Sequence, residues 1–207
     1  MELYNIFEQC KGVTTDSRKI CEGQMFFALH GENFDGNRFA IQALKDGAEW
    51  IIEMDGGLSH IPEELPQFIE KLDEGYDFVQ GSRFIEGGQA INTPLSRHLA
   101  VKFIHAPVIS LTAKERFTDT TNNFRCYSKK YLTHPQVQPF RPIFKTYELL
   151  AYLSTRASQL GLKTCEVPVT RAYPNNGKIP TKISPIKGNS ELMKILMANA
   201  MGKYNPK

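Results

Sequence analysis

Apolar residues along the chain gather in short runs and helical stripes, separated by polar and glycine-rich connections. The stretch "EWIIEMD" (residues 49–55) has an apolar centre and predicts a strand, and "YDFVQGSRF" (residues 76–84) predicts a second strand that runs into a loop. Between them, Ser59 can cap a helix whose inward stripe follows the helical period: Leu65, Phe68, Ile69 and Leu72. Strands that alternate with helices in this way predict an α/β fold.

The first fifty residues carry the same alternation on a smaller scale. "MFFAL" (residues 25–29) is a short apolar run and predicts a strand. A helix is predicted from about Arg38 to Asp46, and Gly47 ends it. This part of the chain is therefore expected to form a small α/β unit.

The second half of the chain continues the alternation. "GGQAINTP" (residues 87–94) predicts a loop, and residues 95–104 predict a helix that His105 and Pro107 stop. Residues 116–132 predict a strand, a loop with an Asn-Asn turn, and then either a strand or a helix. After an extended connector, the pattern predicts a helix, a strand, a basic loop and a last helix, at residues 145–160, 163–170, 173–188 and 190–201. The inward side of the first of these helices is expected to consist of Tyr147, Leu149, Leu150, Leu153 and Ala157.

Composition narrows the class of protein. With 207 residues, of which 41% are apolar, the chain can form one sizeable α/β domain or two small ones. Its cysteines form no C-x-x-C pair and are expected to be reduced thiols: Cys10, Cys21, Cys126 and Cys165. The sequence opens without a signal peptide and has no apolar stretch of about 18 residues that predicts a membrane span. The expected location is the cytoplasm, either free or peripheral at the inner face of the membrane.

Charge is distributed unevenly along the chain. Residues 1–49 carry 5 basic and 8 acidic groups, whereas residues 81–207 carry 19 basic and 6 acidic groups. A basic C-terminal part favours anionic partners such as nucleotide phosphates, lipid phosphates or an anionic membrane surface. The alternative is a generally basic surface without a specific partner. No nucleic-acid partner is expected.

A carboxylate stands at the end of the predicted strand 49–55. Asp55 is followed by two glycines and then by the predicted helix, an arrangement that often presents a metal- and phosphate-binding site. Hard cations such as Mg²⁺ and Mn²⁺ prefer oxygen ligands. The alternative is that Asp55 is only a turn residue at the end of a strand.

Residues 1–48 resemble the N-terminal domain of the Mur ligases, in particular the ligase that adds D-alanyl-D-alanine to the UDP-muramoyl peptide. Three stretches carry the resemblance: "TTDSRKI", "GQMFFALHGENFDGNRF" and "QALKDGA". It implies that Ser17 and Arg18 face a UDP moiety, although His30 stands where that family usually has lysine. The ATP-binding motif G-x-x-x-x-G-K-[ST] of the central Mur domain is absent from the sequence, so a complete ligase is not expected.

Residues 49–207 resemble the second half of a family 2 glycosyltransferase with a GT-A fold, of the dolichol-phosphate mannosyltransferase type. The resemblance lies in stretches that occur in the order of that family: "WIIEMDGGLSHIPEEL", "VQGSRFIEGG", "FTDTTNNFRCYSKKYL", "LGLKTCEVPVT" and "KIPTKIS". It implies a partial GT-A-like, Rossmann-like mixed sheet with flanking helices, preceded by the small α/β Mur-type segment. The usual N-terminal nucleotide-binding half of that family is not expected in this part of the chain.

The resemblance also implies a metal and a catalytic carboxylate. The D-x-D motif that holds Mg²⁺ or Mn²⁺ in this family is reduced here to Asp55-Gly56-Gly57, so one carboxylate would hold the ion together with phosphate oxygens and water. Asp119 stands where the family keeps a carboxylate on the acceptor side, which implies a general base or a sugar-positioning group. The alternative for Asp119 is an Asx-turn that caps Thr121 or Asn122.

Basic residues at family positions imply contacts to phosphate. They are Arg83, Arg97 and Arg125, and Lys178 and Lys182 in the loop that approaches a lipid phosphate in polyprenyl-phosphate enzymes. Each of them could equally be a solvated surface charge. The helix predicted at 190–201 is apolar on most sides, which suggests either packing against the domain or a partner, or peripheral contact with a membrane beside this loop.

The two resemblances together predict a composite chain. The function expected first is glycosyl transfer, of hexosyltransferase type, from a UDP- or GDP-linked sugar to a lipid-phosphate or glycan acceptor in bacterial cell-envelope biosynthesis, with activity impaired because the donor-binding half is missing. The alternatives are a UDP-binding fragment of a Mur ligase, in peptidoglycan precursor synthesis, and an inactive fusion remnant.

Overall fold

A four-stranded mixed sheet forms the centre of the protein. The computed structural model describes residues 13–14, 25–26, 30–31, 34–35, 45, 50–53, 61–174 and 187–206. The strand order is β5-β8-β6-β9, with bounds Trp50–Glu53, Arg125–Ser128, Phe78–Ser82 and Thr164–Pro168. β8 is antiparallel to both of its neighbours, whereas β6 and β9 run parallel. The expected mixed sheet with flanking helices is therefore confirmed.

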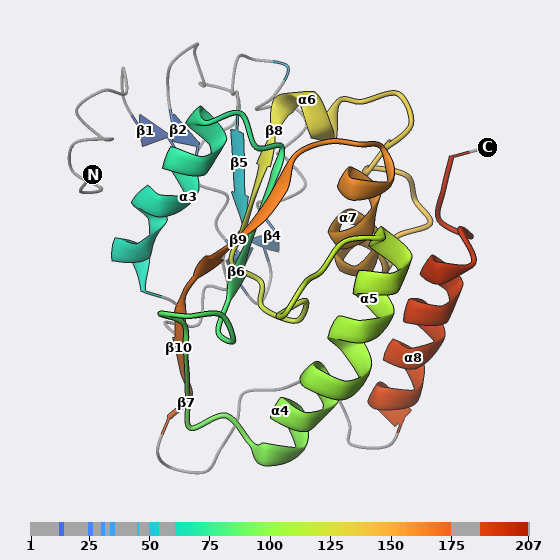
Figure 1. Ribbon diagram of the computed structural model, residues 1–207. Coiled ribbons are helices and arrows are strands. Elements are labelled where there is room, and N and C mark those ends of the chain that lie inside the picture. The colour runs from blue at the N-terminus through green and yellow to red at the C-terminus, as the bar shows by residue number, and fades with distance from the viewer. Residues whose placement is uncertain are drawn as a thin grey trace.

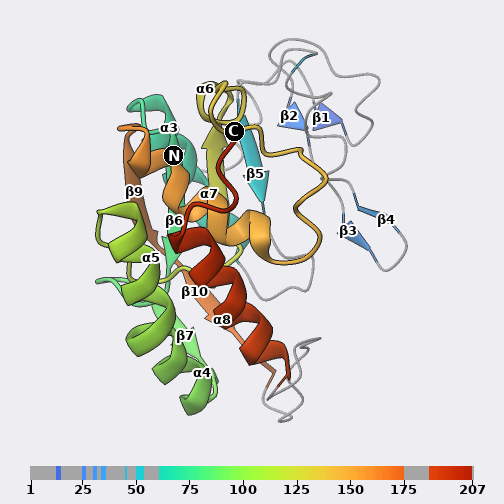
Figure 2. The same ribbon diagram turned by 90° about the vertical axis from the view of Figure 1, so that its right-hand side faces the viewer.

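Helices cover both faces of this sheet (Figures 1 and 2). A 3-10 turn, η3 (Pro62–Glu64), leads into α3 (Leu65–Asp73) on one face, and α7 (Glu148–Gln159) lies on the other with α5 (Ala106–Ala113) and α8 (Lys187–Ala200). Successive residues of β6 point to opposite faces, so Phe78 joins the core under α7 and Val79 joins the core under α3. The predicted stripe of α3, from Leu65 to Leu72, is buried as expected.

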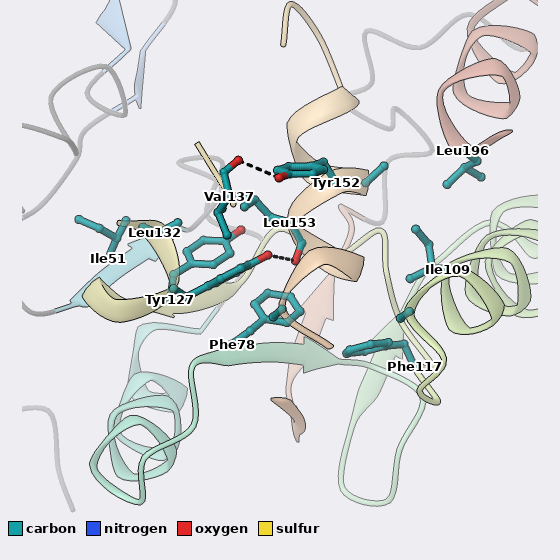
Figure 3. Packing of buried hydrophobic residues seen from close by; sticks show 14 of the residues in the cluster. Ile51, Phe78, Ile109, Phe117, Tyr127, Leu132, Val137, Tyr152, Leu153 and Leu196 are labelled. Atoms are coloured by element: carbon teal, nitrogen blue, oxygen red, sulfur yellow. Dashed lines mark hydrogen bonds between the residues drawn. The ribbon is translucent and has the colours of Figure 1, made fainter. Parts of the chain in front are cut away.

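The core under α7 is rich in aromatic rings that also make polar contacts (Figure 3). Phe78 stacks on Tyr127 with ring centroids 5.5 Å apart. The Tyr131 hydroxyl donates to the Leu153 carbonyl at 2.7 Å, and the Tyr152 hydroxyl donates to the Val137 carbonyl at 2.7 Å. The second of these bonds fixes the irregular segment before α7 to the middle of that helix.

We expect Tyr152→Phe to lower the free energy of unfolding by about 1–2 kcal/mol, because the buried Val137 carbonyl loses its donor. Urea denaturation followed by circular dichroism measures the change. Tyr147→Phe is the control, since Tyr147 is 38% exposed at the start of α7 and should lose little. Equal midpoints for the two variants would contradict the role given to the Tyr152 bond.

A second, smaller parallel pair extends the sheet beyond β6 and β9. β7 (Gln89–Ile91) pairs with β10 (Thr170–Ala172), and the two pairs are joined where the Val169 amide donates to the Ser82 carbonyl at 3.0 Å. The prediction of a loop over residues 87–94 is therefore wrong for Gln89–Ile91. Three residues of mixed polarity give no local strand pattern, and the partner strand lies about eighty residues further along the chain.

One long helical segment replaces the short helix predicted at 95–104. α4 (Leu95–Ala100) continues through a π-helical turn, η4 (Val101–His105), into α5. The predicted stop at His105 and Pro107 is wrong. The wide turn lets the Ala106 amide donate to the Val101 carbonyl, and Pro107 then lies in the first turn of α5, where a missing amide proton is tolerated.

Several other predicted elements are confirmed with shifted bounds, whereas most of the basic loop predicted at 173–188 lies outside the described residues. β8 leads into α6 (Lys129–Leu132), which matches the helix alternative for this region, but no strand forms in the described residues 116–124 before it. α7 begins at Glu148, and the expected inward position of Tyr147 is wrong because that ring is half-exposed. α8 begins three residues before the predicted start.

In the first 48 residues, the structure describes four short strands and Lys45. β1 (Val13–Thr14) pairs parallel with β2 (Met25–Phe26), and β3 (His30–Gly31) pairs antiparallel with β4 (Phe34–Asp35). β2 lies inside the strand predicted at 25–29, and the helix predicted at 38–46 lies outside the described residues except for Lys45. No helix within the described part of the chain is long and apolar enough to cross a membrane.

Candidate functional site

A buried ion pair stands at the end of β6. Arg83 follows the last residue of that strand, and its Nε and Nη2 donate to the two carboxylate oxygens of Asp119 at 2.6 and 2.9 Å. The side chains are 1% and 0% exposed. Burial alone would lower the pKa of the Arg83 guanidinium, but the hydrogen bonds and the charge of Asp119 hold that pKa above its ordinary value. The pair is bidentate, which fixes the plane of the guanidinium.

One nitrogen of Arg83 has no acceptor within hydrogen-bond distance among the described residues, although Arg83 interacts electrostatically with Tyr173. Nη2 also donates to the Thr121 hydroxyl at 2.9 Å, but Nη1 is buried and has no hydrogen-bond partner among the described residues. A buried donor without an acceptor is costly, so such a group in a native structure calls for water or a ligand. A guanidinium nitrogen in this position suits an oxygen of a phosphate.

Two further arginines contact Tyr173, which also interacts with Arg83. Arg97 in α4 donates from Nη1 to the Tyr173 hydroxyl at 2.7 Å, and its guanidinium lies 5.5 Å from the centre of that ring. Arg171 in β10 lies 5.2 Å from the same ring centre, and Arg83 interacts electrostatically with Tyr173. Tyr173 is buried and interacts with arginines from three separate segments, two of which lie over its ring. We name the set of Arg83, Arg97, Arg171 and Tyr173 the arginine cluster.

The small β7–β10 sheet positions Tyr173. The Tyr173 amide donates to the Ile91 carbonyl at 3.1 Å, and Asn92 Nδ2 donates to the Tyr173 carbonyl at 3.0 Å. At the other end, Glu64 accepts from the Thr170 amide at 2.8 and 3.0 Å and ties β10 to the start of α3. Arg97 and Arg171 thus lie in α4 and β10, and Arg83 and Tyr173 directly follow the last residues of β6 and β10. In Figure 1 this region is the lower part of the molecule, where β7 and β10 face α4.

Asp119 itself belongs to an irregular segment between α5 and β8. Its Oδ1 also accepts from the Thr121 amide at 3.3 Å, which is the Asx-type contact expected as the alternative for this residue. The amides of Thr118 and Asp119 both donate to Glu166 in β9, at 2.9 and 3.0 Å. Burial raises the pKa of the Glu166 carboxyl, while the hydrogen bonds from Asp119 and Thr118 act in the opposite direction.

Arg125 is buried in the fold behind this segment. It donates to the carbonyls of Asn122, Leu150 and Thr120 at 3.0, 3.1 and 2.8 Å, and to the Ser154 hydroxyl at 3.0 Å. These bonds join residues 120–122 to α7. The structure therefore gives Arg125 a role in holding the segment, and a phosphate contact from it stays a prediction.

The segment 119–124 also borders the end of β5. Glu53, the last residue of β5, pairs with Arg125 in the sheet, and Asp55 follows two residues later in the sequence. The buried Gln80 side chain donates from Nε2 to the Asn122 carbonyl at 3.0 Å, while its Oε1 has no partner among the described residues. The Thr120 hydroxyl is likewise buried and unpartnered within that part of the chain. Two buried polar atoms that could still form a hydrogen bond therefore lie near the strand that precedes Asp55.

Several predicted site residues lie outside the described residues. They are Ser17, Arg18, Asp55, Lys178 and Lys182. The UDP contact, the metal site and the lysine contacts therefore stay predictions. Within the described ranges, no group of three histidine, cysteine or carboxylate side chains could hold a metal ion.

The helix that carries Arg97 exposes a row of large apolar side chains. Leu95, Phe103 and Leu111 are 72%, 66% and 80% exposed, and Leu99 and Ile104 are also exposed. Water-exposed apolar rows of this extent are typical of surfaces that contact a membrane or a partner. α8 adds the exposed side chain of Met197, and Met201, which directly follows α8, is also exposed.

The sequence analysis named Arg83, Arg97 and Asp119 as candidates, and their roles stay predictions; it did not name Arg171, Tyr173 and Glu166, which the structure places beside them. One signal was present for Glu166, because it is a charged residue inside the otherwise uncharged strand stretch "TCEVPV". Such a residue needs buried partners, and these come from a segment 47 and 48 positions earlier. Arg171 and Tyr173 could not be identified from the sequence, because their positions depend on the pairing of β10 with β7, which was not predicted.

Residues 9–87 of the chain match the Mur ligase family, catalytic domain. The match covers residues 9–48 of the expected Mur-type segment 1–48 and extends beyond residue 48. It confirms the predicted resemblance to Mur ligases.

Curated relatives support the second resemblance. Undecaprenyl-phosphate mannosyltransferase from Micrococcus luteus is 30% identical over 157 residues, which cover 73% of this chain and 63% of that protein. Polyprenol monophosphomannose synthase from Mycolicibacterium smegmatis is 32% identical over 135 residues, which cover 61% of this chain and 47% of that protein. Dolichol-phosphate mannosyltransferase from Pyrococcus furiosus is 32% identical over 90 residues, or 43% of this chain and 26% of that protein.

The chain thus spans less than two thirds of the length of the curated relatives it matches. Two of these relatives are named mannosyltransferases and one a monophosphomannose synthase, so the predicted resemblance to enzymes of hexosyltransferase type is confirmed. The chain combines a segment similar to Mur ligases with a longer part similar to mannosyltransferases that act on polyprenyl or dolichyl phosphates.

Proposed function

We propose that the protein is a GT-A-type family 2 glycosyltransferase that transfers a hexosyl group, mannose first among the candidates, from a nucleotide sugar to a polyprenyl phosphate. The observation that carries the proposal is the arginine cluster with the apolar row beside it. A phosphate acceptor with a long hydrocarbon tail needs a cationic site for its head and an apolar path for its tail. A glycan acceptor would need neither feature.

The acceptor phosphate would bind at the arginine cluster. Arg83 offers the buried Nη1 nitrogen, and Arg97 and Arg171 lie on the same tyrosine ring. Guanidinium groups bind phosphate through paired, directional hydrogen bonds. The tail would then follow the apolar row from Leu95 to Leu111, which begins two residues before Arg97 in the same helix. That row would rest on the membrane surface at the inner face, and the predicted contact through residues 190–201 would add to it.

Asp119 would act on the acceptor side by holding Arg83. Both of its carboxylate oxygens are engaged with that guanidinium, and the side chain is fully buried. A phosphate acceptor is already anionic and needs no general base to attack the anomeric carbon. The donor's anomeric carbon–oxygen bond to the nucleotide diphosphate breaks as the bond to the acceptor oxygen forms.

The donor would bind beside the end of β5. Asp55 would hold Mg²⁺ or Mn²⁺, because one carboxylate, diphosphate oxygens and water form the oxygen ligand set that these ions prefer. The bound ion would neutralise charge on the leaving nucleotide diphosphate. Gln80 Oε1 and the Thr120 hydroxyl are buried and have no partner within the part of the chain that the structure describes, which supports a polar ligand nearby. Lys178 and Lys182 are proposed to approach the acceptor phosphate.

The second candidate function is UDP binding by a Mur-type fragment. The match to the Mur ligase family over residues 9–87 favours it, with Ser17 and Arg18 as the proposed UDP contacts. UDP binding that needs no metal and is lost in Arg18→Ala, without any transfer, would support this function over glycosyl transfer.

Transfer of radiolabelled mannose from GDP- or UDP-mannose to a polyprenyl phosphate in detergent tests the proposed function. We expect product that depends on Mg²⁺ or Mn²⁺, at a rate below about 1 per second if the donor-binding half is incomplete. Arg97→Ala should reduce transfer about tenfold or more, since a charge-assisted contact is worth roughly that factor. Arg97 is partly exposed, so the fold should tolerate its removal.

Arg156→Ala is the matched control, because Arg156 lies in α7 and donates to the Gln136 carbonyl, away from the arginine cluster. Its transfer rate should equal that of the wild-type protein. Equal loss in both variants would contradict a phosphate site at Arg97. Absence of transfer with every mannose donor, together with intact folding, would contradict the transferase function itself.

A further inference from the structure

Glu166 is not one of the residues proposed to bind phosphate. It is, however, connected to Arg83 through hydrogen bonds with Thr118 and Asp119. Its carboxylate accepts from the Thr118 amide at 2.9 and 3.0 Å, from the Asp119 amide at 3.0 Å and from the Thr118 hydroxyl at 2.7 Å. Glu166 lies in β9, in register with Gln80 of β6. A regular strand therefore holds two consecutive amides of an irregular segment.

The hydroxyl contacts form a directed chain. The Phe84 amide donates to the Ser82 hydroxyl at 3.1 Å, and the hydroxyls of Ser82 and Thr118 lie 2.6 Å apart. The Thr118 hydroxyl has one proton, which it gives to Glu166, so Ser82 must donate to Thr118. As the acceptor of the Thr118 hydroxyl, Glu166 thus sets the direction of the hydroxyl bonds that lead from β9 through Thr118 to Ser82, beside Arg83.

Asp119 depends on the same anchor. Its backbone amide is bound to Glu166, while its carboxylate binds the side chain of Arg83 and accepts from the Arg83 amide at 3.2 Å. The segment around it has no helix or strand between Lys114 and Phe124 to fix its position. A shift of the Thr118 and Asp119 amides would therefore move the carboxylate that orients Arg83.

We propose that Glu166 is a positioning residue: it holds the Thr118–Asp119 backbone so that Asp119 turns the Arg83 guanidinium toward the anion. This inference rests on the proposed function only in the identity of the anion, a phosphate group. Glu166 does not touch that phosphate. Its effect reaches the phosphate through Asp119 and Arg83.

Glu166→Gln keeps the size of the side chain and changes only its hydrogen-bonding groups. The amide has nearly the same size as the carboxylate but offers one acceptor oxygen where Glu166 uses two. Either an amide nitrogen then faces the Thr118 amide, or the Thr118 and Ser82 hydroxyls reverse their direction. In both arrangements the residues beside Arg83 lose a partner that the wild-type protein has.

The test follows the side-chain Nε–H of Arg83 by nuclear magnetic resonance in protein labelled with ¹⁵N-arginine. Its signal is identified by its loss in Arg83→Lys. We expect Glu166→Gln to shift this signal and to speed its exchange with water, because the Nε bond to Asp119 at 2.6 Å is disturbed. Titration with inorganic phosphate should give about tenfold weaker binding in the same variant, the loss expected for one charge-assisted contact.

Glu148→Gln is the matched control. Glu148 also accepts from two backbone amides and a threonine hydroxyl, those of Lys145 and Thr146, but it does so at the start of α7. The Arg83 signal and the phosphate affinity should be unchanged in this variant. A general loss of stability would affect both glutamine variants, whereas a positioning role affects only the one at Glu166.

An unshifted Arg83 Nε–H signal in Glu166→Gln would overturn the proposal. If that variant does not fold, Thr118→Val removes the hydroxyl link while keeping the amide bonds, and it should shift the signal in the same direction. No shift in Thr118→Val would then overturn the proposal. If wild-type protein binds no phosphate but the signal shifts, the positioning role stands and the anion site of the proposed function fails.

Discussion

Asp119→Asn is expected to lower the free energy of unfolding by about 3–5 kcal/mol, the loss typical when one partner of a buried ion pair is removed. The substitution keeps the shape of the side chain but leaves the buried Arg83 guanidinium without a counter-charge. It also presents an amide nitrogen where Arg83 Nε or Nη2 now donates at 2.6 or 2.9 Å.

Urea denaturation compares this variant with Glu74→Gln. Glu74 accepts from Lys71 at 2.7 Å, a distance like that of the Arg83 pair, but both partners are solvent-exposed. Exposed ion pairs add little to stability, so Glu74→Gln should unfold close to the wild-type midpoint. If Asp119→Asn also unfolded close to that midpoint, the buried pair would not stabilise this end of the sheet.

Local patterns in the sequence were enough to predict the elements whose buried side follows a regular period. The stripe from Leu65 to Leu72 in α3 is such a case, since every predicted member is buried. The continuation of α4 into α5 was not accessible in this way. Pro107 is a strong local stop signal, and it is overcome by the π-helical turn at Val101–His105, which has no sequence signature of its own.

The sequence was enough to name several residues of the candidate site, but it did not show how their side chains contact one another. Arg83 and Asp119 were each expected to act on substrate phosphate or sugar, and nothing in the sequence indicated that they bind each other across 36 positions. Tyr173 organises the arginine cluster, but it stands in a stretch expected to be a basic loop. Its place depends on β7 and β10, two short strands whose pairing is set by the register of β6 against β9.

The tight turn that follows Arg83 in the sequence leaves no room for a side chain at Gly88. The Gly88 amide donates to the Ile85 carbonyl at 3.0 Å, and this turn brings the Gly88 α-carbon against the backbone of β6. A β-carbon added there would lie 2.5 Å from the Ser82 carbonyl oxygen and 2.8 Å from the carbonyl carbon of Arg83. Both contacts are with backbone atoms, which cannot rotate away as a side chain can.

Gly88→Ala is therefore expected to lower the free energy of unfolding by about 3 kcal/mol, the upper range for overpacking. Moving the Ser82 carbonyl would also break its bond from the Val169 amide, which joins β6 and β9 to the smaller sheet. Because Arg83 moves with this backbone, the affinity for inorganic phosphate should fall as well. Gly75→Ala is the control: Gly75 has φ +87° and nothing near its added β-carbon, so it should cost about 1–2 kcal/mol in backbone strain and leave phosphate binding unchanged. A Gly88→Ala protein with wild-type phosphate affinity would show that the turn at Gly88 and the arginine cluster are independent.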